Sequence, residues 1–293
     1  MTEDIKILDV KITTGYTMQE AVNATLNLLE DKRLNHHICT TNPEFIIDAQ
    51  TDIDFRTIIN SSDFSFPDGV GVALAKLYLD KIADYPRNSV FVLRALYSGM
   101  TLISYLWQDK RSLKTIPGVS FVSELCKTAS SKKLTVGFIG GWPRDSYGRP
   151  LHGEHNIAQT LSTKLTHQYT GLQILIAESN IFHKEDYDID SRNKINAVLK
   201  DQKVDLLFVA FGHPHQEKWI KRNKEFINAN VCIGVGGAFE TLLAANSETI
   251  RGFTGSGYEW LYRLLTQPWR YKRICKAVVV FPIKVFINSL RHS

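Results

Sequence analysis

Features that mark several common protein classes are absent from this chain. Its 293 residues contain four cysteines, and no two of them form a C-x-x-C pair, so neither a zinc site nor a redox dithiol is predicted. The N-terminal stretch MTEDIKILDV has no basic segment followed by an apolar one, and we therefore expect no export signal. No internal repeat and no low-complexity linker interrupts the sequence. These absences favour a cytoplasmic globular protein with reduced, buried thiols.

The motifs that usually hold a nucleotide or a metal are incomplete. The loop Gly234–Phe239 is rich in glycine, but it lacks both the full G-x-G-x-x-G spacing and the lysine of a P-loop. His213 and His215 would not share one face of a helix, and no further histidine or cysteine cluster lies near them. Three acidic pairs have the D-x-D spacing of a metal clamp but do not directly follow an apolar strand: Asp52/Asp54, Asp186/Asp188 and Asp188/Asp190. We expect no metal ion and no cofactor.

The composition is that of a globular protein, since 44% of the residues are hydrophobic and 22% are charged. The formal net charge is +5 at pH 7, but the charge is unevenly distributed. Residues 251–293 contain eight Arg or Lys and a single Glu. A basic C-terminal end is typical of proteins that contact an anionic partner, such as membrane lipid, pyrophosphate or nucleic acid.

Apolar runs alternate with amphipathic ones, which predicts an α/β fold with a Rossmann-like, mostly parallel sheet flanked by helices. The expected strands are His36–Thr40, Leu134–Ile139, Leu172–Ala177, Leu206–Phe211 and Val231–Val235. The expected helices are Thr17–Asp31, Pro43–Ile59, Val70–Ile82, Val119–Ser131, Glu154–Gln168, Arg192–Asp201, Pro214–Asn228 and Phe239–Ala245. We predict an α/β core over residues 1–249 and a helical appendage over residues 250–293.

Two segments depart from this alternation. Val90–Trp107, within a longer insertion at residues 79–113, is a largely apolar run of 18 residues that contains Arg94. A buried or membrane-surface helix is favoured there over a membrane-spanning one. The tail Gly257–Leu290 interleaves aromatic and basic residues, as interfacial membrane anchors do. A packing helix with a solvated basic face explains the tail equally well.

The stretch Val204–Glu240 carries the strongest functional signal. An apolar run ends at Gly212, a polar helix begins at Pro214, and a second apolar run ends at Gly236-Gly237. This strand, helix and strand leave backbone amides open at two neighbouring strand ends. Phosphates usually bind to open amides at the carboxyl edge of a parallel sheet. The chain is therefore expected to handle a nucleotide or a phosphorylated molecule.

Polar side chains with possible site roles also occur at the end of the predicted strand His36–Thr40 and before the predicted helix Val70–Ile82. Thr40 and Asn42 stand where a hydroxyl and an amide can hold a sugar or a nucleotide, although Asn42 before Pro43 is also good helix-capping chemistry. Asp68 precedes a glycine-containing turn, where an aspartate can act as a general base or cap the next helix. Taken alone, these residues favour the capping roles.

Taken in order, six motifs resemble the WecG/TagA/CpsF family of bacterial glycosyltransferases (glycosyltransferase family 26). The motifs are TTNPEF (Thr40–Phe45), PDGVGV (Pro67–Val72), FIGG (Phe138–Gly141), GHPHQEKW (Gly212–Trp219), GVGGAFE (Gly234–Glu240) and YEWLYRLLTQPWRYKR (Tyr258–Arg273). The similarity extends from His37 to Arg273, most of the chain. Each motif is weak alone, but six of them in the right order are specific.

The resemblance implies an inverting, metal-independent transfer from a UDP-sugar to a polyprenyl-diphosphate-linked saccharide in cell-surface polysaccharide biosynthesis. The sugar would be an N-acetylhexosamine, its uronic acid or a hexose. The enzyme would be cytoplasmic and peripheral on the inner face of the bacterial plasma membrane, bound to anionic lipid and not to nucleic acid. An exposed apolar tail would favour homo-oligomers when lipid is absent.

The resemblance also implies roles for particular residues. The family's catalytic aspartate falls on Asp68, its threonine and asparagine after the first strand on Thr40 and Asn42, and its active-site glutamine on Gln216. The expected contacts with the UDP-sugar are Gly212, Gly236, Gly237, Glu240 and the appendage arginines Arg263, Arg270 and Arg273. The chemistry is consistent with this, because one carboxylate can deprotonate an acceptor hydroxyl while arginines and open amides balance the charge of departing UDP.

The chain departs from the family pattern in three places. The segment between Leu79 and Leu113 is longer than usual, and we expect it to contact the membrane or to cover the acceptor cleft. Thr115 stands where an arginine is usual, with Lys114 and Arg111 as the nearest cations, and His215 stands where a lysine is common. Two other functional classes fit parts of the sequence: a nucleotide- or phosphate-binding regulatory module that docks on anionic membrane, and a metal-dependent D-x-D glycosyltransferase. Binding to anionic surfaces without UDP would favour the first, and loss of activity with a chelator would favour the second.

Overall fold

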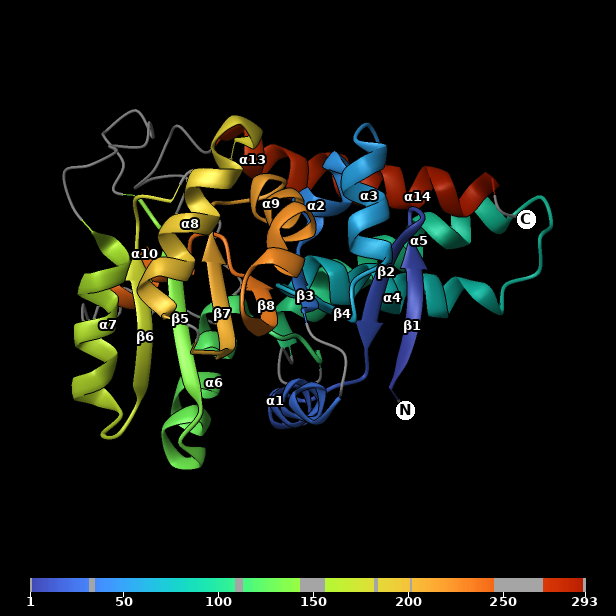
Figure 1. Ribbon diagram of the computed structural model, residues 1–293. Coiled ribbons are helices and arrows are strands. Elements are labelled where there is room, and N and C mark those ends of the chain that lie inside the picture. Colours follow the sequence, from blue (N-terminus) through green and yellow to red (C-terminus); the bar gives the residue numbers. More distant parts are fainter. Residues whose placement is uncertain are drawn as a thin grey trace.

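The computed structural model describes residues 2–31, 35–108, 113–142, 156–181, 184–200, 202–244 and 271–291, and for residues 103–108 it describes the backbone alone. The strands are β1 (Glu3–Ile7), β2 (Val10–Thr14), β3 (His36–Thr41), β4 (Phe64–Pro67), β5 (Thr135–Gly140), β6 (Gln173–Glu178), β7 (Val204–Ala210) and β8 (Ala229–Gly234). The last six form a parallel sheet in the order β4-β3-β8-β7-β5-β6 (Figure 1). The predicted α/β fold with a parallel sheet is confirmed.

Helices cover both faces of this sheet (Figure 1). The α-helices are α1 (Met18–Asn27), α2 (Pro43–Asp48), α3 (Ile53–Asn60), α4 (Val70–Ala83), α5 (Phe91–Gln108), α6 (Gly118–Lys132), α7 (Ile157–Gln168), α8 (Asp188–Leu199), α9 (His215–Asn223), α10 (Ala238–Ala244), α13 (Tyr271–Cys275) and α14 (Phe281–Arg291). A π-helical turn, η5 (Lys276–Val280), joins the last two, and short 3-10 turns occur at Leu28–Glu30, Glu185–Tyr187 and Lys224–Phe226.

The central strands are buried on both faces, which explains their nearly continuous apolar runs. In β7, Leu206 and Phe208 contribute to a core shared with α1, α6, α7 and α10. The alternate residues Leu207 and Val209 contribute to a second core with α8 and α9. Because successive side chains of a strand point to opposite faces, one strand supports both layers of helices.

A third core lies beyond β4 and includes the C-terminal helix. The antiparallel hairpin β1-β2 packs there with α2, α3, α4 and α5. Phe281 and Val285 of α14 are buried in this core, with 1% and 4% of their surface exposed. The Tyr78 and Ser289 hydroxyls lie 3.1 Å apart and link α4 to α14. The described part of the appendage therefore packs on the rest of the chain.

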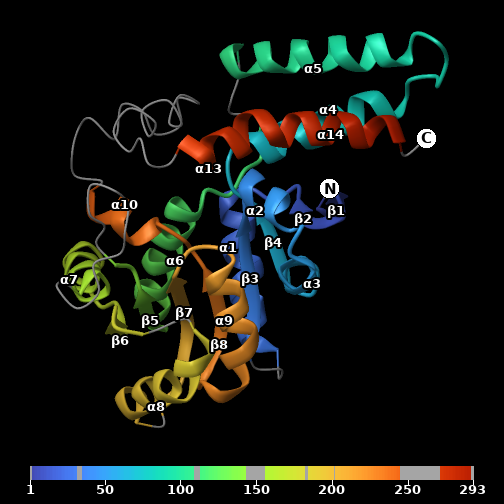
Figure 2. The same ribbon diagram turned by 90° about the horizontal axis from the view of Figure 1, so that it is seen from above.

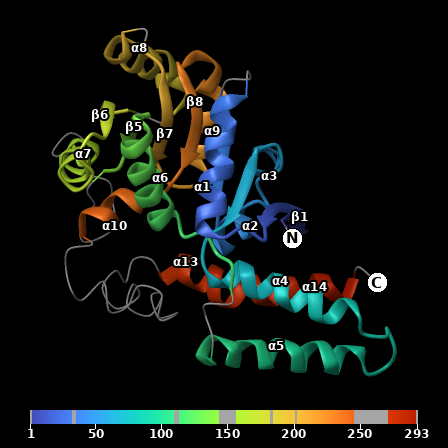
Figure 3. The ribbon, with the colours of Figure 1, turned by 90° about the horizontal axis from the view of Figure 1, so that it is seen from below.

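Helices α4, α5 and α14 lie side by side at one end of the molecule, and α5 is outermost (Figures 2 and 3). Figure 2 also shows that the stretch from α13 to α14 passes the end of β3 where α2 begins. No helix in the described ranges is long and apolar enough to span a bilayer.

The structure corrects the predicted helix Pro43–Ile59. It consists of two helices, because Asn42 caps α2 and Asp52 caps α3, accepting a hydrogen bond from the backbone N–H of Phe55 at 3.0 Å. The strands β1, β2 and β4 were not predicted. The apolar run Val90–Trp107 does form a helix, as expected, which begins at Phe91 as α5.

Candidate active site

Four neighbouring strands end in residues predicted for the site. Asn42 follows β3, Asp68 follows β4, Gly212 lies two residues beyond β7, and Gly236 lies two residues beyond β8. These strands are adjacent in the order β4-β3-β8-β7, and all of them are parallel. Their carboxyl ends therefore form one edge, which is where ligands bind in open parallel sheets. The fold gathers residues that are up to 194 positions apart, as the contact between Thr40 and Gly234 shows.

Thr40 and Asn42 hold the backbone at this edge. The Thr40 hydroxyl is 4% exposed and donates to the carbonyl oxygen of Gly234 at 2.9 Å, which ties β3 to β8. The Asn42 Oδ1 accepts from the backbone N–H groups of Glu44 and Phe45 at 2.9 and 3.2 Å. The helix-capping interpretation of Asn42 is confirmed, and its contact with a sugar stays a prediction.

Asp68 does not cap the helix that follows it. The N-cap of α4 is Gly69, at φ +88°, and no side chain caps that helix. The backbone N–H of Asp68 donates to the Thr41 carbonyl oxygen at 2.9 Å, and its Oδ1 accepts from the N–H of Gly118 at 3.4 Å. The carboxylate is half-buried between the starts of α4 and α6. This position at the edge is compatible with a general base.

Gln216 joins the two glycine loops. Its side chain is fully buried, and its Oε1 accepts from the N–H of Gly212 at 3.1 Å and from the N–H of Gly236 at 2.8 Å. One amide oxygen therefore fixes the loops after β7 and β8 relative to each other. The geometry gives Gln216 a positioning role, and direct contact with substrate stays a prediction.

Glu217 is a buried acid that the sequence did not single out. Its Oε1 accepts from Gln216 Nε2 at 2.7 Å, and its Oε2 has no hydrogen-bond partner among the described residues. Desolvation in this fully buried position raises the pKa of Glu217 from 4.5 to about 8. At neutral pH the group is therefore a protonated acid. The sequence shows only that a glutamate follows the glutamine of the motif, and it does not indicate that the glutamate side chain is buried.

Each of the two glycine loops contains a glycine with a positive φ angle. Gly212 has φ +77° and Gly236 has φ +53°, and an added Cβ would meet nothing within 4 Å at either position. Both are left-handed conformations, which disfavour residues with a Cβ. Gly237 is exposed and Glu240 is half-buried in the first turn of α10. Among the residues that the structure describes, no atom lies within 4 Å of the place where a Cβ would stand on either glycine.

Cations of the appendage contact the same edge. Arg273 Nε donates to Glu44 Oε2 at 2.6 Å, and Lys276 Nζ donates to Asp48 Oδ1 at 2.5 Å. Glu44 belongs to the TTNPEF motif, so Arg273 lies at the motif but pairs with a carboxylate in this structure. Arg263 and Arg270 lie outside the described residues. Contact of these three arginines with a diphosphate stays a prediction.

His213, which follows Gly212 in the glycine loop, lies next to the carboxylates of Glu44 and Asp48. Its Nε2 lies 3.2 Å from Asp48 Oδ2 and 3.7 Å from Glu44 Oε2. Its ring packs on Phe45, with 4.5 Å between ring centroids. The hydrogen bonds from His213 and Lys276 lower the pKa of Asp48 and outweigh the opposing effect of its burial. We call Glu44, Asp48, His213, Arg273 and Lys276 the appendage clasp.

One acidic residue of each D-x-D pair, Asp52 or Asp188, has structural partners. Asp52 caps α3 and lies 2.7 Å from Lys218 Nζ. Asp188 accepts from Arg222 Nε at 2.7 Å and from Asn223 Nδ2 at 3.0 Å. Over the described ranges no group of three or more His, Cys, Asp and Glu side chains could hold a metal ion. The absence of a metal requirement stays a prediction.

Lys114, the cation next to Thr115, contacts the loop between β2 and α1. Lys114 Nζ donates to the carbonyl oxygen of Gly15 at 2.8 Å, on the loop between β2 and α1. Arg111, the other candidate substitute for the family arginine, lies outside the described residues. Lys114 is therefore engaged away from the glycine loops.

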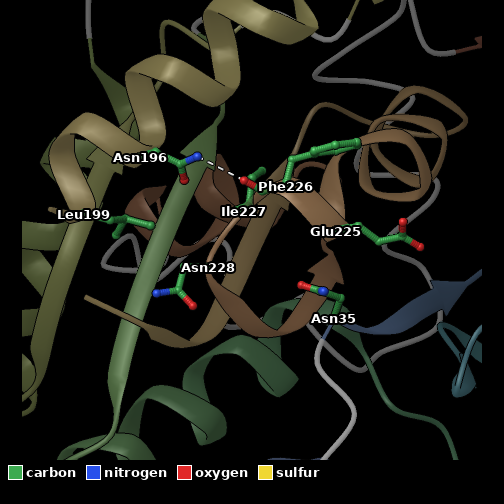
Figure 4. Close-up of a pocket in the computed structure, with 7 residues that line it drawn as sticks. All are labelled: Asn35, Asn196, Leu199, Glu225, Phe226, Ile227 and Asn228. Atoms are coloured by element: carbon green, nitrogen blue, oxygen red, sulfur yellow. Dashed lines mark hydrogen bonds between the residues drawn. The ribbon is translucent and has the colours of Figure 1, made fainter. Parts of the chain in front are cut away.

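A hollow of about 320 Å³ lies at the opposite edge of the sheet (Figure 4). It is lined by Asn35, Asn196, Leu199, Glu225, Phe226, Ile227 and Asn228. Asn35 and Asn228 directly precede β3 and β8, so the hollow is at the amino ends of the strands. None of the predicted site residues lines it, and we assign it no role in the reaction.

Comparison with known proteins identifies the chemistry expected of this edge. The model of the glycosyl transferase WecG/TagA/CpsF family matches residues 5–91 and 94–293. The chain belongs to this family. It is therefore a glycosyltransferase, and both the resemblance and the enzyme class predicted from the motifs are confirmed.

Relatives of this glycosyltransferase with an assigned activity carry the same name. A protein of Bacillus subtilis (strain 168) is 25% identical over 244 residues, which cover 83% of this chain and 77% of the relative. A protein of Staphylococcus aureus (strain NCTC 8325 / PS 47) is 22% identical over 284 residues, covering 97% of this chain and 92% of the relative. Both are named N-acetylglucosaminyldiphosphoundecaprenol N-acetyl-beta-D-mannosaminyltransferase.

Proposed function

We propose that this glycosyltransferase moves N-acetylmannosamine from a UDP-sugar to an N-acetylglucosamine that is linked to a polyprenyl diphosphate. The observation that carries the proposal is the family match over nearly the whole chain, together with the gathering of Asp68 and both glycine loops at one sheet edge. The sugar and the acceptor follow the names of the relatives. The reaction would contribute to cell-surface polysaccharide biosynthesis.

In this reaction Asp68 takes the proton of the acceptor hydroxyl. The hydroxyl oxygen then forms a bond to the anomeric carbon as the bond from that carbon to the UDP oxygen breaks. UDP leaves with the electron pair, and attack from the opposite face inverts the anomeric centre. One carboxylate is sufficient for this step.

The charge that develops on UDP needs donors at the site. The N–H groups of Gly212 and Gly236 themselves donate to Gln216 Oε1, so the donors would be other backbone N–H groups of the two loops. The glycines would let a diphosphate approach the backbone closely. Arg263, Arg270 and Arg273 would add bidentate cations, since guanidinium groups match phosphate oxygens. Arg273 would then exchange its contact with Glu44 for a phosphate contact when the donor binds. The proposal therefore needs no divalent ion.

We also propose that the enzyme is peripheral on the inner face of the plasma membrane, where a lipid-linked acceptor is found. The appendage supports this, because α13, η5 and α14 carry five Lys or Arg and no Asp or Glu. Val279, Ile283 and Ile287 are also exposed there, by 50%, 51% and 42%. Basic and apolar residues on one helical stretch favour an anionic lipid surface.

The test is transfer from UDP-N-acetylmannosamine to a synthetic N-acetylglucosaminyl-diphospholipid, with and without a chelator. We expect a disaccharide product whose rate does not change with the chelator, and nuclear magnetic resonance should show an inverted anomeric centre. UDP-glucose, UDP-N-acetylglucosamine and UDP-N-acetylmannosaminuronic acid serve as competing donors. Transfer that stops with the chelator would support the metal-dependent class, and retention of configuration would exclude the single-step mechanism.

A further inference from the structure

Helix α5 has two opposite apolar sides. Its inner side packs on the third core and is buried at Phe91, Ala95, Ser98 and Leu102. This spacing of four, three and four positions is one face of a helix. A globular protein normally has polar residues on the other side, but here that side is apolar as well.

The outer side of α5 exposes large hydrophobic residues. Leu93, Tyr97 and Met100 are exposed by 67%, 69% and 64% and follow one another at spacings of four and three. Val90, Val92 and Leu96 lie on the same helix or at its start and are exposed by 39%, 49% and 49%. Single exposed apolar residues are common on proteins, but a contiguous group of six marks a surface that is covered by a partner. We call these six residues the outer stripe.

The charges on α5 and on the neighbouring appendage have one sign, whereas α4 and its C-cap add Asp80 and Asp84 as well as Lys76 and Lys81 at this end of the molecule. Arg94 is the single charged residue of α5, and it is exposed beside Leu93. The neighbouring stretch from α13 to α14 contains Lys and Arg but no Asp or Glu. Helix α14 packs against α5 through the third core. The partner that covers this end of the molecule is therefore expected to present negative charge around an apolar interior.

A second copy of this chain fits that description poorly. In a symmetric dimer the same patch meets itself. Arg94 would then face a second α5, which carries no carboxylate, and burying a charge without a partner is costly. An anionic lipid bilayer supplies phosphate groups for Arg94 and acyl chains for the outer stripe. Apolar residues with flanking basic ones are typical of helices that lie in the plane of a membrane surface.

We propose that the outer stripe of α5 is a second lipid-contact surface, in addition to the appendage. The proposal rests on the proposed function, because a lipid-linked acceptor places the reaction at a membrane. Figures 2 and 3 show α5 as the outermost layer beyond α4 and α14, at the end of the molecule where α2 begins. The stripe from Val90 to Met100 is about 15 Å long, as a helix rises about 1.5 Å per residue. Contact at two places would fix the orientation of the sheet edge relative to the bilayer.

The test is co-sedimentation of the full chain with vesicles of phosphatidylglycerol and phosphatidylcholine. Leu93→Asp places a carboxylate in the outer stripe, and Met100→Asp is a second variant at a similarly exposed position. The matched control is Ile189→Asp, because Ile189 is 68% exposed in the first turn of α8, away from α5 (Figure 2). We expect each stripe variant to lower the vesicle partition coefficient about tenfold, since a charge on the apolar face opposes insertion. The control should bind as the unmodified chain does.

Three outcomes would overturn the proposal. Vesicle binding by Leu93→Asp and Met100→Asp at the level of Ile189→Asp would show that α5 does not contact lipid. Conversion of a dimer into a monomer by the stripe variants, with vesicle binding unchanged, would assign the stripe to a second copy. Equal binding to pure phosphatidylcholine and to phosphatidylglycerol vesicles, unaffected by Arg94→Glu, would remove the charge argument.

A transfer assay separates this proposal from the proposed function. With a short-chain acceptor that is soluble in water, Leu93→Asp should transfer sugar at the rate of the unmodified chain, because α5 does not contribute to the glycine loops or to Asp68. With the acceptor embedded in vesicles, its transfer rate should fall about as much as its lipid binding. Failure of the unmodified chain to transfer sugar would refute the proposed function alone, since the vesicle result does not depend on turnover.

Discussion

The unfolding free energy of Glu217→Gln, compared with that of the unmodified chain, should increase as the pH rises. Glu217 is fully buried and has a pKa of about 8, against an ordinary value of 4.5. Below the ordinary value, both the folded and the unfolded chain hold the proton. Between the two values the unfolded chain has lost the proton and the folded chain has kept it. Over this range stability therefore falls as the pH rises, by about 1.4 kcal/mol per pH unit.

Glutamine removes this pH dependence while it preserves the local contact. Its side-chain oxygen can still accept from Gln216 Nε2, which now lies 2.7 Å from Glu217 Oε1. From about pH 6 to about pH 7.5, the advantage of Glu217→Gln in unfolding free energy should grow by about 2 kcal/mol. The assay is urea denaturation of both proteins at several pH values, followed by tryptophan fluorescence. An advantage that stays constant over this range would refute the assignment of a protonated, buried Glu217.

Two further predictions concern the contacts around the glycine loops. Arg273→Glu and Glu44→Arg should each lower stability, and the double variant should recover part of the loss. The coupling free energy between the two substitutions should be about 0.5 kcal/mol, since Arg273 is half-exposed. It is measured by thermal denaturation of the two single variants and the double variant. If the stability losses of the single variants add up to that of the double variant, the contact between Arg273 and Glu44 is excluded. Gly234→Ala should cost about 1–3 kcal/mol and weaken UDP binding, because its Cβ would lie 2.5 Å from Glu217 Oε1 and 2.7 Å from Gln216 Nε2. If Gly234→Ala has the same urea midpoint as the unmodified chain and binds UDP with the same affinity in calorimetry, the close packing of Glu217 and Gln216 on Gly234 is not needed.

The alternation of apolar and amphipathic runs was sufficient to predict the sheet. Each of the five predicted strands overlaps a strand of the structure, because buried parallel strands are continuous apolar runs. The missed elements are short and atypical. Strand β4 has four residues and ends in Pro67, and the β1-β2 turn places Leu8 and Asp9 at φ +51° and +61°. Such a turn usually contains Asn-Gly, so the sequence gives no hairpin signal there.

The site was predictable where it depends on strand ends and not where it depends on contacts between distant segments. Thr40 and the glycine loops lie at the ends of predicted strands, so they can be placed at one edge from the sequence, whereas Asp68 follows β4, which was not predicted. The side chain of Glu217 lies close to Gly234, and in the appendage clasp Arg273 contacts Glu44 and Lys276 contacts Asp48, which are 229 and 228 positions apart. Helix periodicity in α5 likewise does not reveal which of its two apolar sides packs on the core.

The central claim is that Asp68 deprotonates the acceptor while the glycine loops hold UDP. Its most direct test is the transfer rate of Asp68→Asn, with Asp84→Asn, an exposed aspartate at the end of α4, as the matched control. Loss of a general base should lower the turnover rate by about 100-fold or more with UDP affinity nearly unchanged, while the control stays at the rate of the unmodified chain. Full turnover by Asp68→Asn would contradict the account.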